Sequence, residues 1–111
     1  MSKNTRAKTL PRKVQNNLTI MGQQIKLARK RRKLSLACMA ERTQCSELTL
    51  MRAERGEPSV SIGIYARILY GLGLDEDLLL IARKDEAGNA LVNARIIRRN
   101  DHNDDDYDVF D

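Results

Sequence analysis

Apolar residues recur at helical spacing along most of the chain. Ile25 and Ala28 predict a first helix over residues 22–32, whose other face is nearly all Lys and Arg. Ser35 suits the N-cap position of a short second helix over residues 36–43, since its hydroxyl can accept a hydrogen bond from a free backbone N–H. The first forty residues therefore predict two helices joined by a short link.

A third helix follows after a link of only three residues. Ser46 is a second N-cap candidate, and it opens a helix that ends at residue 54 or 55, with Leu50 and Ala53 on its apolar side. Gly56, with a proline two residues later, fits the usual order of a helix stop. The sequence therefore predicts two short helices joined by a tight turn.

Two further helices are expected before residue 82. The fourth runs from about residue 61 to residue 72, and either Gly71 or Gly73 closes it. The fifth begins at Asp75, where three acids suit the positive end of the helix dipole. The expected apolar face of the fourth helix consists of Ile62, Tyr65, Leu69 and Leu72.

The ends of the chain lack this pattern and set the expected domain limits. Residues 1–17 are polar and basic and predict a flexible arm, and residues 100–111 predict a disordered acidic tail. The helical pattern defines one domain over residues 18–82, followed by an extension over residues 83–99. Residues 89–99 favour a helix, although Ile96-Ile97 also suits a strand. The predicted fold class is all-α, with five helices and a C-terminal extension.

Charge is distributed very unevenly. All 20 Lys and Arg and nine of the 15 Asp and Glu lie in residues 1–100, which gives this part a net charge of +11, while residues 101–111 carry −6. No acid precedes Glu41, whereas eleven Lys and Arg do. Such a field attracts phosphate, so nucleic acid is the expected partner. A solvated, self-repelling N-terminus is the alternative.

Several other classes of protein lack support in the sequence. The only histidine is His102, and no phosphate-binding glycine loop or His-Glu-x-x-His motif occurs, so we expect no enzyme. Cys38 and Cys45 are poorly spaced for zinc and are interpreted as reduced thiols. Neither a secretory signal nor a membrane span is evident, so a cytoplasmic protein without metal or cofactor is expected. A protein-interaction module remains an alternative.

The helical pair and its neighbours resemble the XRE family of phage-repressor-like helix-turn-helix proteins over Gly22 to Leu80. The resemblance is carried, in order and spacing, by Ile25, Ala28-Arg29, Leu34-Ser35, Met39-Ala40, Cys45-Ser46, Thr49-Leu50, Glu54-Arg55-Gly56 and Leu72-Gly73. It implies a repressor that binds double-stranded DNA as a homodimer across a palindromic operator, with the third helix in the major groove of each half-site.

The resemblance also implies which residues contact DNA. Arg52 can bond guanine in a bidentate manner, Glu47 can accept from a cytosine amino group, and Leu48 can meet a thymine methyl. Glu47 can instead serve only the helix dipole, and Arg52 can be a solvated cation. The full set of expected DNA contacts is Lys33, Leu36, Ser46, Glu47, Leu48, Thr49, Arg52 and Arg55, of which Lys33 and Arg55 are expected at phosphates.

Two other positions are implied to be structural, and two depart from the family pattern. Arg29 and Glu54 occupy positions that pair in the family and tie the first helix to the third. Leu36 stands where relatives usually carry Gln, so a polar DNA contact is lost. Gln44 stands where a glycine with positive φ is common, so mild strain is expected in the turn.

The extension has a looser resemblance of its own. An Asp-x-x-Gly-x-x-Leu stretch over residues 85–91, followed by basic residues, looks like HipB-type antitoxins, which pair with HipA-type Ser/Thr kinase toxins. A plain phage or chromosomal repressor without a toxin partner is the alternative. The acidic tail is expected to damp non-specific DNA binding, to dock in a basic groove of a partner, or only to keep the protein soluble.

Overall fold

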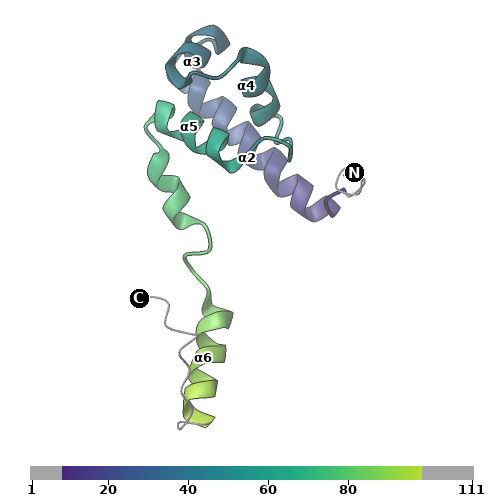
Figure 1. The fold of residues 1–111 in the computed structure, drawn as a ribbon, viewed down its shortest axis with the longest axis vertical. Helices are drawn as coiled ribbons and strands as arrows, with labels where there is room; N and C mark the ends of the chain where they lie inside the picture. The colour runs from purple at the N-terminus through teal and green to yellow at the C-terminus, as the bar shows by residue number, and fades with distance from the viewer. Residues whose placement is uncertain (1–8, 99–111) are drawn as a thin grey trace. The chain divides into compact units, whose positions relative to one another are not determined.

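The computed structural model describes residues 9–98, and helices are the only regular elements in that range (Figure 1). The all-α prediction is therefore confirmed. The chain divides into two compact units, with the boundary after Leu78, and each unit is described by itself. The elements are α2 (Arg12–Arg31), α3 (Leu36–Thr43), α4 (Glu47–Glu54), α5 (Ile62–Leu72), the 3₁₀ helix η1 (Asp75–Leu80) and α6 (Glu86–Arg98).

Three serines begin the short helices of the first unit. The hydroxyl oxygens of Ser35, Ser46 and Ser61 each accept a hydrogen bond from the backbone N–H three residues further on, at 3.0 to 3.2 Å. Each such cap contributes about 1 kcal/mol to helix stability. At the other end of a helix, Gly73 closes α5 in the left-handed conformation with φ 79°. The predicted caps of α3 and α4 are thus in place.

The core of the first unit is built from α2, α3, α4 and α5, which pack against one another. Met39, Leu50 and Ile68 are its largest fully buried side chains. The expected face of α5 is partly wrong, because Ile62 is 65% exposed while Ile68 is completely buried. The buried apolar residues are Ile25, Ala28, Met39, Leu50, Ala53, Tyr65, Ile68 and Leu72.

Two glycines let α2 lie directly against the end of α4. A Cβ atom on Gly22 would lie 2.5 Å from the carbonyl oxygen of Glu54 and 2.7 Å from the backbone nitrogen of Gly56. Gly56 itself has φ 75° and faces the backbone of Leu18. Since all these neighbours are backbone atoms, no side-chain movement relieves such a contact, and the crossing requires glycine.

The first helix begins earlier than the sequence pattern indicated. The predicted flexible arm over residues 1–17 is wrong for residues 12–17, which form the start of α2. Val14, Leu18 and Met21 continue the helical spacing of the core residues. The side-chain amide of Gln15 also donates to the carbonyl oxygen of Gly56 at 3.0 Å, which anchors this turn to the end of α4. Residues 1–8 of the predicted arm lie outside the described residues.

The segment after α5 also differs from expectation. The fifth helix is a six-residue 3₁₀ helix, η1, in which no residue is buried. With no buried apolar face, this segment has little packing to favour a regular α-helix, and short 3₁₀ helices are common as connectors. The first compact unit ends at Leu78, within η1.

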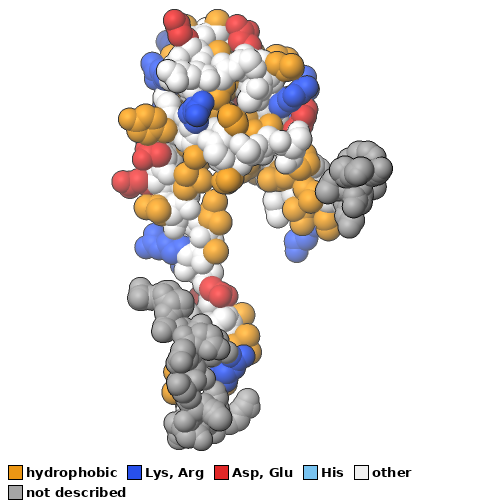
Figure 2. All heavy atoms as spheres, viewed as in Figure 1, with side chains coloured by type: hydrophobic (Ala, Val, Ile, Leu, Met, Phe, Trp, Pro, Cys, Tyr) orange, Lys and Arg blue, Asp and Glu red, His pale blue; other side chains and the backbone are white. Residues whose placement is uncertain are grey.

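The second unit contains α6. This helix begins at Glu86, so the helical interpretation of residues 89–99 is confirmed for residues 89–98 and the strand alternative is wrong. The carboxylate of Asp85 accepts a hydrogen bond from the backbone N–H of Gly88 at 3.0 Å. Leu91 and Ile96 are exposed, and hydrophobic side chains of this unit are visible on the surface in Figure 2. The predicted acidic tail lies outside the described residues.

Candidate nucleic-acid interface

A tight left-handed turn sets the geometry of α3 and α4. Gln44 adopts φ 58° and ψ 38°, a conformation that costs a residue other than glycine about 1 to 2 kcal/mol. The backbone N–H of Cys45 donates to the carbonyl oxygen of Ala40 at 3.1 Å, which satisfies the end of α3. Met39 from α3 and Leu50 from α4 are fully buried in the same core, so the two helices are fixed relative to each other.

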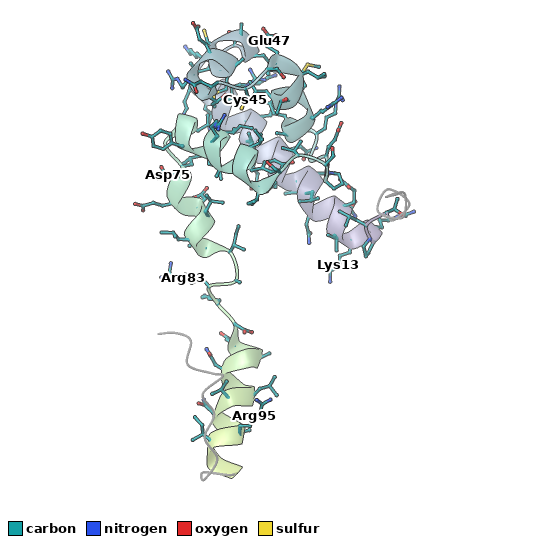
Figure 3. All side chains as sticks on the ribbon, in the orientation of Figure 1. Lys13, Cys45, Glu47, Asp75, Arg83 and Arg95 are labelled. Atoms are coloured by element: carbon teal, nitrogen blue, oxygen red, sulfur yellow. The ribbon has the colours of Figure 1, made fainter. Side chains whose placement is uncertain are left out.

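The helix α4 has one buried face and one exposed face. Leu50, Ala53 and Glu54 are buried. Glu47, Leu48, Met51 and Arg52 are exposed, and Figure 3 labels Glu47 at the start of the helix. Ser46 donates its hydroxyl proton to Oγ1 of Thr49 at 2.9 Å while capping the helix. The exposed face thus offers a carboxylate, apolar groups and a guanidinium on one short helix.

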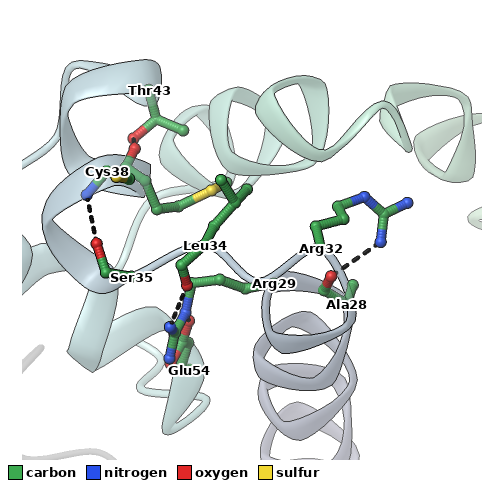
Figure 4. Close-up of polar contacts among 9 residues, drawn as sticks. Ala28, Arg29, Arg32, Leu34, Ser35, Cys38, Thr43 and Glu54 are labelled. Carbon is green, nitrogen blue, oxygen red and sulfur yellow. Dashed lines mark hydrogen bonds and ion pairs between the residues drawn. The ribbon is translucent and has the colours of Figure 1, made fainter.

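A buried ion pair joins α2 to α4. Nε and Nη2 of Arg29 donate to the two carboxylate oxygens of Glu54 at 2.7 and 3.1 Å, and Nη1 donates to the carbonyl oxygen of Leu34 at 2.8 Å (Figure 4). The pKa of Arg29 is raised, first by the hydrogen bonds to Glu54, against the opposing effect of burial. The three contacts connect α2 to α4 and to the link between α2 and α3. The side chains of Arg29 and Glu54 are both buried.

Two expected DNA contacts, Arg52 and Arg55, share one carboxylate. Nη1 of Arg55 lies 3.3 Å from Oε2 of Glu57, and Nε of Arg52 lies 3.9 Å from Oε1 of the same side chain. All three side chains are partly or largely exposed. The sequence interpretation missed Glu57. Its position two residues after Arg55 and five after Arg52, across the Gly56 turn, is the sequence signal for these contacts.

A shallow cleft of about 280 Å³ lies beside Arg52. Three of its lining residues carry hydroxyl groups, namely Thr49, Ser59 and Ser61. Val60 and Ile64 complete the wall. Hydroxyl and guanidinium donors around an open cleft suit the oxygens of a nucleic-acid backbone. Ser59 and Ser61 were not among the residues expected from the sequence to contact DNA.

The remaining expected contacts lie on the α2–α3 link and the first turn of α3. Lys33 is exposed and adopts a left-handed conformation with φ 55°. Leu36 is partly buried and packs against the core, so the residue that departs from the family pattern contributes to packing. The last turn of α2 carries Arg29, Lys30 and Arg31, whose positive charges interact favourably with the negative end of the helix dipole.

This arrangement of two short helices, a left-handed turn and an exposed second helix agrees with a comparison to known families. A family model described as a helix-turn-helix domain matches residues 20–80, more than half of the chain. The chain belongs to this helix-turn-helix family. No curated protein and no solved structure shows a significant match to it. The helix-turn-helix protein is accordingly a DNA-binding regulator, with α3 and α4 as its helical pair.

Within the part of the chain that the structure describes, no helix is long and apolar enough to cross a membrane. Within residues 9–98, no group of three His, Cys, Asp or Glu side chains lies close enough together to hold a metal ion. Cys38 and Cys45 are free thiols, one exposed and one partly buried.

Proposed function

We propose that the protein is a sequence-specific repressor that binds a palindromic operator as a homodimer, with one α4 in the major groove at each half-site. The observation that carries this proposal is the division of α4 into a fully packed inner face and an outer face that exposes Glu47, Leu48 and Arg52. A helix with fixed orientation and exposed base-reading groups is the arrangement by which such proteins discriminate sequences.

The roles of the individual residues follow from their chemistry. Arg52 bonds guanine and Leu48 meets a thymine methyl, while Glu47 accepts from cytosine. Arg55 and Lys33 contact phosphates and set the position of the domain on the duplex, together with Thr49 and Ser46 near the backbone. Leu36 contributes an apolar contact at the edge of the groove.

Binding to a selected site tests the proposal. Fluorescence anisotropy gives the affinity for an operator chosen from a random library and the affinity for a scrambled duplex, each at several salt concentrations. The operator should bind at least about 10³-fold more tightly, and the preferred site should be a palindrome with half-site centres about one helical turn apart. Equal affinities, within about threefold at every salt concentration, would overturn the repressor function.

Two single substitutions separate base reading from phosphate contact. Arg52→Ala should weaken operator binding by about 1 to 3 kcal/mol and relax the preference at one base pair. Lys33→Ala should weaken binding to all sequences alike and should make the slope of log affinity against log salt concentration shallower by about one. If both variants lose affinity equally and without regard to sequence, Arg52 contacts only phosphate.

We infer further that the regulator is an antitoxin that binds a HipA-type kinase while on its operator. The second unit, which begins at Leu79, supports this inference, because four of its large apolar side chains are exposed, namely Leu79, Leu80, Ile81 and Leu91. Apolar groups exposed in this way are typical of a surface that a partner covers.

Co-expression with the product of the neighbouring gene decides between an antitoxin and a plain repressor. An antitoxin should co-elute with that product in size-exclusion chromatography and should rescue growth. Leu91→Glu, on the exposed side of α6, should reduce both effects, whereas Arg52→Ala should leave them intact. Failure of the full-length protein to bind or neutralise an adjacent kinase would leave the plain repressor, and binding to a different protein without operator binding would indicate an interaction module.

A further inference from the structure

Glu57 stands between the two arginines of the proposed interface and contacts them differently. It approaches Arg55 at a terminal nitrogen, Nη1, at 3.3 Å. It approaches Arg52 at Nε, at 3.9 Å. The terminal nitrogens of Arg52 are therefore not the atoms nearest to the carboxylate, and they are the atoms that a guanine would use in a bidentate contact.

The carboxylate projects from a backbone held at two points. The N–H of Glu57 donates to the carbonyl oxygen of Arg52 at 3.1 Å, and the carbonyl oxygen of Glu57 accepts from the hydroxyl of Tyr65 at 3.2 Å. Tyr65 is buried in the core, and its pKa is raised by that burial and then by the negative charge of Glu57. Glu57 thus projects from a turn that is tied both to α4 and to α5.

We propose that Glu57 is a specificity-determining residue of the DNA interface, which competes with phosphate for Arg55 and orients Arg52 for base reading. The proposal rests on the proposed function of α4. On non-operator DNA the domain relies on phosphate contacts alone, so the carboxylate weakens binding there. On the operator the charge of Glu57 near Nε of Arg52 favours the orientation in which the terminal nitrogens of Arg52 face a guanine. The better placed guanine contact offsets the loss of phosphate binding by Arg55.

The amide variant Glu57→Gln removes the negative charge and keeps the size of the side chain. At about 50 mM salt, it should bind non-operator DNA about threefold more tightly than the wild type does. The slope of log affinity against log salt concentration should be steeper by about one, as expected for one more neutralised phosphate. Affinity for the operator should stay equal or fall. The ratio of operator to non-operator affinity should therefore fall at least about threefold.

Two controls separate this role from a change in net charge or in folding. Glu76→Gln, at an exposed carboxylate of η1 outside α4 and the turn around Gly56, makes the same change in net charge and should leave the affinity ratio unaltered. In an Arg55→Gln background, Glu57→Gln should no longer strengthen non-operator binding. Thermal unfolding should be nearly the same in all these variants, because exposed ion pairs contribute little to stability.

The outcomes distinguish the inference from the function on which it rests. Equal effects of Glu57→Gln and Glu76→Gln, or equal gains on operator and non-operator DNA, would overturn the role of Glu57 and leave the repressor function standing. A wild-type protein without any operator preference would overturn both. Retention of the full gain in the Arg55→Gln background would show that the carboxylate does not act through Arg55.

Discussion

At the scale of single residues, the ion pair of Arg29 and Glu54 carries the strongest prediction. Both side chains are buried, with relative exposures of 8% and 7%. Replacing Glu54 by Ala leaves a buried guanidinium without its counterion, and such a change costs about 3 to 5 kcal/mol. Chemical denaturation of the Glu54→Ala variant should show this loss.

A double variant serves as the control for that measurement. Because hydrophobic replacement of both partners of a buried pair is often neutral, Arg29→Met combined with Glu54→Leu should recover most of the lost stability. The operator affinity of the folded double variant should match that of the wild type. Unchanged stability of Glu54→Ala together with lost DNA binding would contradict a structural role for the pair.

Single residues also show where sequence reasoning succeeds and where it stops. The Arg29–Glu54 contact was expected from the family resemblance, because it depends on fixed positions in a shared pattern. Ile62 was wrongly placed in the core, since helical spacing alone does not fix where the apolar stripe ends. Glu57 went unnoticed because its contacts depend on the turn around Gly56, which brings it back towards α4.

At the scale of helices, the close crossing of α2 and α4 leads to a matched pair of glycine substitutions. Gly22→Ala places a methyl group against backbone atoms, and the stability loss should exceed about 2 kcal/mol, as in overpacked cores. Gly63→Ala, in α5, meets only the Ser61 hydroxyl at 3.8 Å. That variant should gain about 0.5 to 1 kcal/mol, since alanine favours helices.

Equilibrium unfolding in urea measures both changes under the same conditions. The opposite signs are diagnostic, because both substitutions add one methyl group to a helical glycine. A gain in stability from Gly22→Ala would show that the backbone of α4 lies further than 2.5 Å from the added Cβ atom.

The ends of the elements were harder to predict than their existence. The serine caps of α3 and α4 were predicted correctly because capping is local chemistry between neighbours in the sequence. The early start of α2 was missed although Val14, Leu18 and Met21 continue the helical spacing, whereas the contact of Gln15 with Gly56, 41 residues away, has no local signal. The six-residue η1 follows from a lack of burial, which sequence alone does not reveal.

At the scale of the whole molecule, the division into two units predicts two different responses to substitution. Leu50→Ala creates a cavity in the first unit and should cost about 2 to 5 kcal/mol. Leu91→Glu changes an exposed residue of α6 and should shift the thermal midpoint of the isolated protein by less than about 2 °C. Circular dichroism at 222 nm during heating follows both. A large shift from Leu91→Glu would show that α6 is buried in the isolated protein.

The two-faced character of α4 has a consequence for how this protein can evolve. The residues that keep the helix in place, Leu50 and Ala53, are separate from Glu47, Leu48 and Met51, which face outwards. Under the proposed function, exchange of the outward residues should change the preferred base pairs while the free energy of unfolding stays nearly constant. The product of a duplicated gene can therefore come to recognise a new operator through a few substitutions, each of which leaves the protein folded. Related copies in one genome can diverge in their DNA targets while they keep one fold.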